Sequence, residues 1–463
     1  MSGSANDALL EQARRLSLDY LREQEERFVG ARASRQELIE ALGGPLGETG
    51  ESAASVLDRL AGQAARGSIA SGSPRYFGFV IGGTYPVALA SDWLTSTLDQ
   101  NAGLYATSPW AAVVEQVAAD WLLEVLDLPR ESSVGFVTGC QAANFTCLAA
   151  ARHGLLRRAG WDVEADGLAG APRINIVTSA ESHVTVDVAL RYLGLGTRAA
   201  HRIETDAQGR LLPERLRELL ATLDGPTLVC AQAGNVNTGA FDPMDAVGDA
   251  VRDHPNAWLH VDAAFGLWAR ASRALAPLAM GVDKADSWAT DAHKWLNVPY
   301  DCGVAIVRHR QDHRDAMTSS AAYLMQTKGE ERDAVDWTPE FSRRARGVPT
   351  YATLRTLGRQ GIEALLDGSC AAARAFAQAL SAEPGVAVLN EVVLNQVLVR
   401  FGDDDAVTRA VVSAVQADGT CWLSGTTWHG VAAMRISVSN WQTGADDVAR
   451  SVEAILRAFR GLR

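Results

Sequence analysis

A lysine between a histidine and a tryptophan is the residue of this chain best suited to do chemistry. Lys294 stands in the stretch 290–296 (TDAHKWL), directly before the apolar run 303–307. It is one of three lysines, with Lys284 and Lys328, among 43 basic residues. Burial disfavours the charged form of an amine, and a neutral lysine amine can form a Schiff base with a carbonyl group. The stretch therefore favours a Schiff-base lysine. The alternative is a structural lysine whose ammonium group reaches the surface.

A glycine turn offers a second feature with chemical potential. Gly139 and Cys140 lie between an apolar run and a segment rich in alanine and leucine. A strand–glycine–helix junction presents free backbone N–H groups and the positive end of the helix dipole, which suits a phosphate group. Many turns of α/β proteins also contain a glycine for steric reasons alone. The turn alone is therefore weak evidence for a phosphate site.

An aspartate and a histidine follow two further apolar runs. Asp262 lies in the stretch 260–264 (HVDAA), where a carboxylate can pair with a protonated ring nitrogen, or can simply cap a helix. His183 lies in the stretch 179–183 (SAESH), where an imidazole can stack on a flat ring, or can cap a helix at the surface. All four features follow predicted strands, so we expect them along one edge of one sheet. A phosphorylated aromatic ligand would fit such an edge.

The first part of the chain is expected to be helical. Residues 7–28 carry apolar side chains at helical spacing, which predicts an amphipathic helix. Ser34 with Glu37 resembles a capping box that opens a second helix. The segment 73–86 is rich in glycine and aromatic residues, which is typical of a loop.

The middle of the chain alternates between helical and strand-like patterns. The expected strands are 134–137, 174–178, 227–231, 257–261 and 303–307. Such alternation predicts an α/β fold with a mostly parallel sheet covered by helices on both faces. After residue 360 the pattern changes to helices and strands, one of them at about 434–438, which predicts a smaller α+β domain.

Composition excludes several classes of protein. The 463 residues are 47% hydrophobic and carry a net charge of -12, which argues against binding nucleic acid through a basic surface. No apolar run approaches the roughly 18 residues of a membrane span, and no secretory signal is visible at the N-terminus. The six cysteines lack the spacing of a metal site or of a disulfide framework. We therefore expect a cytoplasmic protein with reduced thiols and no metal.

Two motifs give the chain a family resemblance. The stretch 293–296 (HKWL) is followed by 300–303 (YDCG), and the stretch 260–264 (HVDAA) stands upstream. With these motifs the chain resembles the group II pyridoxal-5′-phosphate (PLP)-dependent amino-acid decarboxylases, which include the aromatic-L-amino-acid, glutamate and histidine decarboxylases. It looks most like a bacterial branch of that family. The resemblance extends from about residue 74 to about residue 443.

The resemblance implies an architecture. The family has the type I, aspartate-aminotransferase-like fold, and its members form homodimers with active sites at the subunit interface. Applied to this sequence, it implies an N-terminal helical segment (1–75) that packs on the dimer partner, a large PLP-binding domain (76–355) and a small C-terminal α+β domain (356–463).

The resemblance also implies roles for individual residues. Lys294 would form the Schiff base with PLP, and Asp262 would pair with the ring nitrogen, so that the ring acts as an electron sink. His183 would stack on the ring face. The phosphate would be held by residues of the glycine turn and beside the lysine, namely Gly139, Cys140 and His293.

Other implied roles depend on parts of the chain that are less specific to the family. Asn235 lies in a segment that replaces a threonine-rich family stretch touching the cofactor. Arg435 matches a family arginine near the active site, and the alternative is a structural arginine of the small domain. Phe79 would belong to the substrate pocket, whose aromatic character favours a substrate such as tryptophan, tyrosine or phenylalanine.

The resemblance implies a reaction whose product depends on one proton transfer. Tyr323 would protonate the carbanion that remains after CO2 leaves, and a tyrosine at this position favours an amine product. Alternatives are oxidative deamination to an aldehyde, transamination, decarboxylative carbon–carbon bond formation, or decarboxylation of an acidic or small amino acid. A paralogue that binds PLP without catalysis is a further alternative.

The sequence departs from the family pattern at two further places in the expected site. Family members often have Asn-Pro before the His-Lys pair, where this chain has Asp291 and Ala292. Because an acid beside a phosphate is repulsive, we expect Asp291 to point away or to bind another group. At Cys140 the family more usually has a serine.

Overall fold

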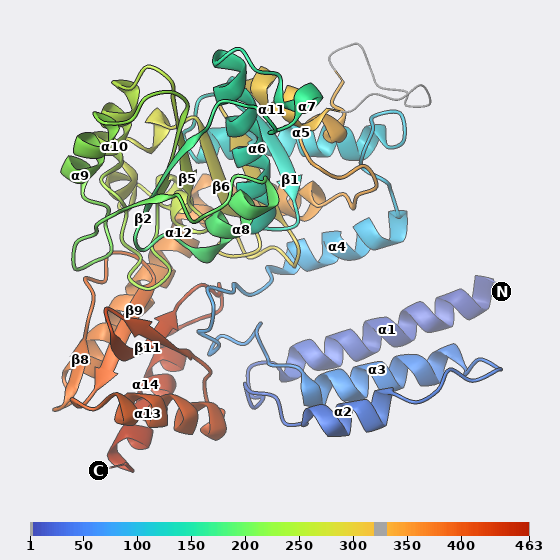
Figure 1. The fold of residues 1–463 in the computed structure, drawn as a ribbon. Helices are drawn as coiled ribbons and strands as arrows, with labels where there is room; N and C mark the ends of the chain where they lie inside the picture. Colours follow the sequence, from blue (N-terminus) through green and yellow to red (C-terminus); the bar gives the residue numbers. More distant parts are fainter. Residues whose placement is uncertain (1–2, 319–330, 463) are drawn as a thin grey trace.

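The computed structural model describes residues 3–318 and 331–462 and contains two sheets with their covering helices (Figure 1). The strands are β1 (Ser133–Val137), β2 (Asn175–Ser179), β3 (His201–Ile203), β4 (Thr227–Gln232), β5 (Ala257–Asp262), β6 (Ser287–Asp291), β7 (Gly303–Val307), β8 (Val386–Val388), β9 (Gln396–Phe401), β10 (Ser424–Trp428) and β11 (Val431–Ser437). The α-helices are α1 (Gly3–Glu23), α2 (Arg35–Leu42), α3 (Ala53–Gly67), α4 (Pro86–Leu98), α5 (Pro109–Val125), α6 (Cys140–Arg158), α7 (Val163–Asp166), α8 (Val184–Tyr192), α9 (Pro213–Leu220), α10 (Met244–Arg252), α11 (Arg310–Met317), α12 (Gly347–Ser381), α13 (Asp405–Asp418) and α14 (Ala445–Arg460). Short 3-10 helices are η1 (Gly266–Ala271), η2 (Ala276–Ala279), η3 (Val282–Lys284) and η4 (Ala334–Asp336).

The larger sheet has seven strands in the order β1-β7-β6-β5-β4-β2-β3. The strands β3, β2, β4, β5 and β6 pair in parallel, whereas β7 pairs antiparallel with both β6 and β1. The five strands expected from the sequence are present, and the prediction of a mostly parallel sheet is confirmed. The sequence missed β3 and β6, because β3 has only three residues and β6 mixes apolar and polar side chains.

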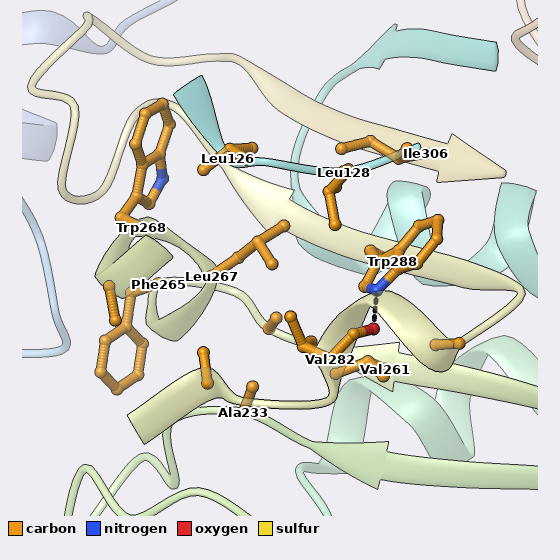
Figure 2. Close-up of a cluster of buried hydrophobic side chains, with 14 of the residues drawn as sticks. Leu126, Leu128, Ala233, Val261, Phe265, Leu267, Trp268, Val282, Trp288 and Ile306 are labelled. Carbon is orange, nitrogen blue, oxygen red and sulfur yellow. Dashed lines mark hydrogen bonds between the residues drawn. The ribbon is translucent and has the colours of Figure 1, made fainter. Parts of the chain in front are cut away.

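Helices cover both faces of this sheet. Along β4 the side chains alternate, so that Leu228 and Cys230 pack with α6 and α8 while Val229 and Ala231 join the opposite core. Figure 2 shows part of that opposite core, where the Trp288 indole donates a 2.8 Å hydrogen bond to the carbonyl oxygen of Val282. Burial on both faces explains why these strands read as apolar runs.

The smaller sheet has four antiparallel strands in the order β10-β11-β9-β8, and α13 and α14 pack on it. The expected strand near 434–438 corresponds to β11. The predicted domain boundary at 355/356 falls inside α12, close to its kink at Gly358, where φ is 58°. The division of the chain into three domains stays a prediction.

The N-terminal helices lie together, apart from the larger sheet (Figure 1). The capping box of α2 is formed as expected, with the Ser34 and Glu37 side chains each accepting a hydrogen bond from the other's backbone N–H. The helix α1 ends at Glu23, five residues before the expected limit of 28. Among the described residues, no helix is long and apolar enough to cross a membrane.

Candidate active site

The carboxyl ends of four strands of the larger sheet carry the residues singled out in the sequence. Gly139 and His183 follow β1 and β2, Asp262 ends β5, and Lys294 follows β6. Contacts between these segments confirm that they meet: Cys140 Sγ lies 3.5 Å from Asp262 Oδ1, and a Cβ built on Gly139 would lie 3.3 Å from His293 Cε1. The edge of the sheet thus assembles one polar site, as the sequence predicts.

Asp262 is the buried carboxylate at the centre of this site. Its side chain is 5% exposed, and its Oδ2 accepts hydrogen bonds from Asn144 Nδ2 at 3.2 Å and from Thr185 Oγ1 at 3.4 Å. Its Oδ1 also accepts a hydrogen bond from the backbone N–H of Ala264 at 3.3 Å. These donors fix the orientation of the carboxylate, whose oxygens are acceptors suited to pair with a protonated ring nitrogen.

A chain of hydrogen bonds through Asn144, His260 and Ser287 holds the Asp262 carboxylate in place. Ser287 Oγ lies 2.9 Å from His260 Nδ1, and His260 Nε2 lies 2.9 Å from Asn144 Oδ1. Since the amide oxygen only accepts, His260 must donate from Nε2, and Asn144 then donates to Asp262. Burial lowers the pKa of His260 to about 4, against the opposing charge of Asp262, so this imidazole is neutral at pH 7. The sequence pointed to Asp262 but not to Asn144, whose only signal is a polar residue in an apolar helix.

His183 both caps a helix and reaches the site. It is the N-cap of α8, and its Nδ1 lies 2.8 Å from Thr185 Oγ1, the hydroxyl that also contacts Asp262. Burial lowers the pKa of His183, partly offset by Asp262. The neutral ring therefore stands beside the central carboxylate. Of the two readings from the sequence, helix capping is thus confirmed, and stacking on a cofactor ring stays a prediction.

The glycine turn is shaped by two glycines in contact. Gly139 is the N-cap of α6, and no side chain caps the first turn of this helix. A Cβ on Gly303, at the start of β7, would collide with the backbone of Gly139. Burial, together with the charges of Asp262 and Asp291, raises the pKa of the Cys140 thiol well above its ordinary value. The turn is therefore a close-packed cradle with open N–H groups and a protonated thiol.

Lys294 forms an ion pair that the sequence did not predict. Its Nζ lies 3.1 Å from Asp291 Oδ2; the lysine side chain is 20% exposed and the aspartate 2%. Burial lowers the pKa of Lys294. Asp291, Cys140 and Asp262 together raise this pKa by more than burial lowers it, so the net shift is upward. The expectation that burial makes this amine neutral is therefore wrong for the protein without cofactor. Of the two outcomes expected for Asp291, binding another group is the one found.

His293 is held by the segment that leads into β7. Its Nδ1 accepts a hydrogen bond from the backbone N–H of Cys302 at 3.1 Å, and its ring lies 4.3 Å from that of Tyr300. Its Nε2 lies 3.5 Å from Asp291 Oδ1. Burial lowers the pKa of His293 despite the charge of Asp291. This histidine is thus a neutral neighbour of the Lys294–Asp291 pair.

Arg435 is a buried guanidinium group on β11. It is 8% exposed, its Nη1 donates to the carbonyl oxygen of Val236 at 3.3 Å, and its Nε has no hydrogen-bond partner among residues 3–318 and 331–462. Burial lowers its pKa, while Tyr76 raises it. Across the described part of the chain, no carboxylate lies within ion-pair distance of this arginine. Such a group is suited to bind an anion.

The segment 73–86 passes directly beside the lysine. A Cβ on Gly82 would collide with the carbonyl oxygen of Lys294, and the Tyr85 N–H donates to Asn297 at 2.7 Å. Phe79 is 57% exposed, and its ring lies 5.6 Å from that of Trp422. The loop predicted from the sequence is present, and Phe79 stands on it as an exposed aromatic side chain.

Two asparagines organise loops around the site. The Asn235 side chain accepts hydrogen bonds from the N–H groups of Asn237 and Thr238, so these contacts lie inside its own loop. Asn297, which the sequence did not single out, donates from Nδ2 to the carbonyl oxygens of Trp295 and Ser439, each at 2.9 Å. Asn297 thereby ties the lysine segment to the C-terminal part of the chain. A cofactor contact by Asn235 stays a prediction, and Tyr323 lies outside the described residues.

Comparison with known families identifies the class of protein. The pyridoxal-dependent decarboxylase conserved domain matches residues 45–401. The chain therefore belongs to the pyridoxal-dependent decarboxylase family, whose cofactor is PLP.

Individual relatives agree with this assignment. The acidic amino acid decarboxylase GADL1 of Mus musculus is 30% identical over 77% of this chain and 65% of its own length. The L-2,4-diaminobutyrate decarboxylase of Rhizobium meliloti (strain 1021) is 29% identical over 90% of this chain and 84% of its own. Among solved structures, Oryza sativa TDC with PLP and tryptamine has a TM-score of 0.93 at 24% identity, covering 100% of this chain and 99% of that one. This likeness confirms the type I fold.

The residues of the site fit PLP. The uncapped N-terminus of α6 offers N–H donors for a phosphate, and the buried Asp262 carboxylate can pair with a ring nitrogen. Lys294 supplies the amine that binds the aldehyde carbon. Asp291 Oδ1 also faces the glycine turn without a hydrogen-bond partner among the described residues, and a charged carboxylate there would oppose a phosphate rather than hold it.

Proposed function

We propose that this protein decarboxylates an L-amino acid to the corresponding amine and CO2 with PLP as cofactor. The observation that carries the proposal is the convergence of Lys294, Asp262 and His183 beside the uncapped α6 N-terminus at one sheet edge. The family assignment supports the same reaction class. The match covers 65% of the mouse relative, and the activity of this chain is therefore our proposal.

Each of these residues has a distinct task in the proposed reaction. Bound PLP supplies a protonated ring that accepts the electron pair of the bond broken as CO2 departs. Lys294 would hold the cofactor covalently through its Nζ amine. Asp262, oriented by Asn144, would keep a proton on the ring nitrogen, and His183 would contact the ring.

Further residues complete the cofactor contacts and supply a proton in this proposal. The N–H groups after Gly139, the Cys140 thiol and His293 hold the phosphate, and they keep the cofactor in one orientation. Asn235 orders the loop that reaches toward it. Tyr323 delivers the proton to Cα of the substrate after CO2 has left, which makes an amine the product.

Arg435 and Phe79 are the proposed substrate contacts. Arg435 has no carboxylate partner in the described part of the chain, so it can bind a carboxylate of the substrate. Phe79, together with Tyr76 and Trp422, forms an aromatic cluster, with Tyr76 stacked on Trp422 at 5.2 Å between ring centroids. This cluster supports an aromatic amino acid as the substrate. An acidic amino acid is the second candidate, supported by Arg435, which has no carboxylate partner among the described residues, and by the acidic amino acid decarboxylase relative. A diamino acid is supported by the L-2,4-diaminobutyrate decarboxylase relative alone.

The test is a substrate panel with product analysis. The purified protein with PLP is incubated separately with the twenty amino acids, L-2,4-diaminobutyrate and cysteine sulfinate, and CO2, amine, aldehyde and peroxide are measured. We expect CO2 and amine in equal amounts, fastest with tryptophan, tyrosine or phenylalanine. Aldehyde with peroxide in place of amine would contradict the reaction, and fastest turnover of an acidic or diamino acid would contradict the aromatic substrate.

Two variants give the controls for this assay. Lys294→Ala should lose the visible absorbance of the bound cofactor and all CO2 release. Tyr323→Phe should keep cofactor absorbance and CO2 release but change the product from amine to aldehyde. A Tyr323→Phe enzyme that still forms only amine would exclude Tyr323 as the proton donor.

A homodimer in the cytoplasm is the proposed working form. Large apolar side chains on α1, α3 and α4 are exposed in the single chain, and the set is Leu10, Leu21, Val56, Leu60, Trp93, Leu94 and Leu98. A groove of about 580 Å³ runs between these helices. All six cysteines are free, which agrees with a reducing compartment. Light scattering after size-exclusion chromatography should give twice the mass of one chain, and a monomer would contradict the dimer.

A further inference from the structure

Asp291 is a buried acid with two differently placed oxygen atoms. Its Oδ2 lies 3.1 Å from Lys294 Nζ, whereas its Oδ1 has no hydrogen-bond partner among the described residues and lies 3.5 Å from His293 Nε2. Its side chain is 2% exposed, so water does not compensate its charge. In the protein without cofactor, the ammonium group of Lys294 is what balances this carboxylate.

Cofactor attachment would remove that balance. Lys294 must lose its ammonium proton before its nitrogen can bond to a carbonyl carbon. Asp291 would then be a buried carboxylate without its counter-charge, a state that costs several kcal/mol. Its Oδ1 also lies 3.7 Å from a Cβ built on Gly139, so the acid faces the turn proposed to hold the phosphate. A charged carboxylate there would repel that phosphate.

We propose that Asp291 accepts the proton that Lys294 loses and keeps it while the cofactor is bound. This inference rests on the proposed function. In the transfer, an N–H bond of the ammonium breaks, its electron pair stays on Nζ, and the proton bonds to Asp291 Oδ2. The ion pair becomes a neutral amine and a neutral carboxylic acid, with no other reactant needed. The neutral acid then no longer repels a phosphate at the turn that its Oδ1 faces, and the proton returns from Oδ2 when Lys294 is set free.

The other titratable groups around the pair do not offer an equal acceptor. They are Cys140 on α6, His183 on α8, Asp262 on β5, and His293, Tyr300 and Cys302 around the lysine segment. Asp262 is already bonded to Asn144 and Thr185. Among the described residues, Asp291 is the acid in ion-pair contact with Lys294 Nζ. Geometry therefore favours Asp291.

The first experiment measures the ion pair without cofactor or activity. Full-length protein freed of PLP is treated with acetic anhydride, which acetylates only neutral amines, and peptide mass spectrometry gives the extent at each lysine. Asp291→Asn should raise acetylation of Lys294 at pH 8 by about 10- to 1,000-fold, because an opposite charge at this distance shifts a pKa by about 1–3 units. Unchanged acetylation of Lys294 would overturn the proposal.

Lys284 is a matched internal control. It is 19% exposed, like Lys294, and pairs with Asp245 at 2.7 Å and Asp249 at 2.6 Å. Asp291→Asn should leave the acetylation of Lys284 unchanged, and Asp249→Asn should raise acetylation of Lys284 but not of Lys294. Wild-type protein alone also tests the idea, since Lys294 that acetylates more readily than a free lysine would contradict the ion pair.

The second experiment detects the transferred proton. An infrared difference spectrum, recorded as PLP is added to wild-type protein, should gain the carbonyl band of a protonated carboxylic acid, and D2O should shift this band. The band should be absent in Asp291→Asn, remain in Asp242→Asn, and move in Asp291→Glu. A spectrum without a new acid band, or a band that persists in Asp291→Asn, would overturn the inference.

These measurements use no amino-acid substrate, so they are independent of the reaction assay. If PLP binds and the acid band appears but no amino acid releases CO2, the proposed reaction fails while the role of Asp291 stands. If CO2 is released without the acid band, the role of Asp291 fails alone.

Discussion

Acidification from pH 8 to pH 5 should destabilise this protein through two buried histidines. Burial lowers the pKa of His260 to about 4 and that of His313 to about 3, from an ordinary value of 6.5. As the pH falls below 6.5, the unfolded chain binds a proton at each histidine while the folded chain does not. The stability that these neutral imidazoles provide is therefore complete above pH 6.5 and is lost as the pH falls toward 4.

The magnitude follows from these pKa values. At pH 5 each histidine has lost about 2 kcal/mol of its contribution to the free energy of unfolding, or about 4 kcal/mol for the pair. Asp242 acts in the opposite direction, because burial raises its pKa to about 6 and the folded chain then binds a proton first. Protonation of Asp242 in the folded chain therefore offsets about 1 kcal/mol of the stability that the histidines lose at pH 5. His183 and His293, whose pKa values burial also lowers, add to the loss, so we expect at least about 3 kcal/mol in total.

Urea unfolding of the cofactor-free protein at pH 8, 7, 6 and 5 measures this loss. The free energies are taken where fluorescence and circular dichroism transitions coincide. His313→Gln should reduce the difference between pH 8 and pH 5 by about 2 kcal/mol, whatever it does to stability at pH 8. His201→Gln, on the edge strand β3, is the control. If His313→Gln shows the same pH difference as the wild type, the assignment of neutral buried histidines is refuted.

Three substitutions give further tests. Glu115→Gln should lower the free energy of unfolding, measured in urea, by about 3–5 kcal/mol, because Glu115 forms a fully buried ion pair with Arg343 at 2.9 Å. The control is Glu124→Gln on the same helix, which removes the exposed ion pair with Arg359 and should cost at most about 1 kcal/mol. Gly303→Ala should weaken PLP binding at least tenfold in an absorbance titration, since the added methyl group collides with the Gly139 turn; unchanged affinity would contradict a cradle there. Arg435→Gln should raise the KM of the substrate about 10- to 100-fold and leave PLP affinity unchanged, because a hydrogen bond to a charged group contributes about 1.5–3 kcal/mol. Loss of PLP binding instead would assign Arg435 to the cofactor.

The sequence predicted this edge of the sheet because Gly139, His183 and Asp262 follow or end apolar runs, whereas Lys294 follows β6, which the sequence did not reveal. Asp262 ends β5 and His183 follows β2, and the carboxyl ends of parallel strands share one edge. Periodicity cannot reveal which side chains touch across that edge. The contact between Cys140 and Asp262 depends on the order of the strands, and no local pattern encodes it.

The state of Lys294 shows where local reasoning fails. Burial alone predicts a lowered pKa, and that contribution is indeed the largest one acting on this amine. The net shift is nevertheless upward, because Asp291 stands three residues before it at 3.1 Å. The sequence revealed the unusual aspartate but not the orientation of its side chain, since a turn can point such a side chain toward the lysine or away from it.

The antiparallel direction of β7 explains why the most specific motifs of the chain lie so close together. Strand β6 runs toward the site and β7 runs away from it, so the connection between them lies entirely at the ligand edge. That connection holds Lys294 near its beginning and Cys302 at its end, and the Cys302 N–H donates to His293 across it. The first residue of β7, Gly303, consequently packs against Gly139 at the end of β1. A parallel β7 would carry its first residue to the opposite edge. The reversal of one strand therefore brings the lysine segment and the glycine turn into contact.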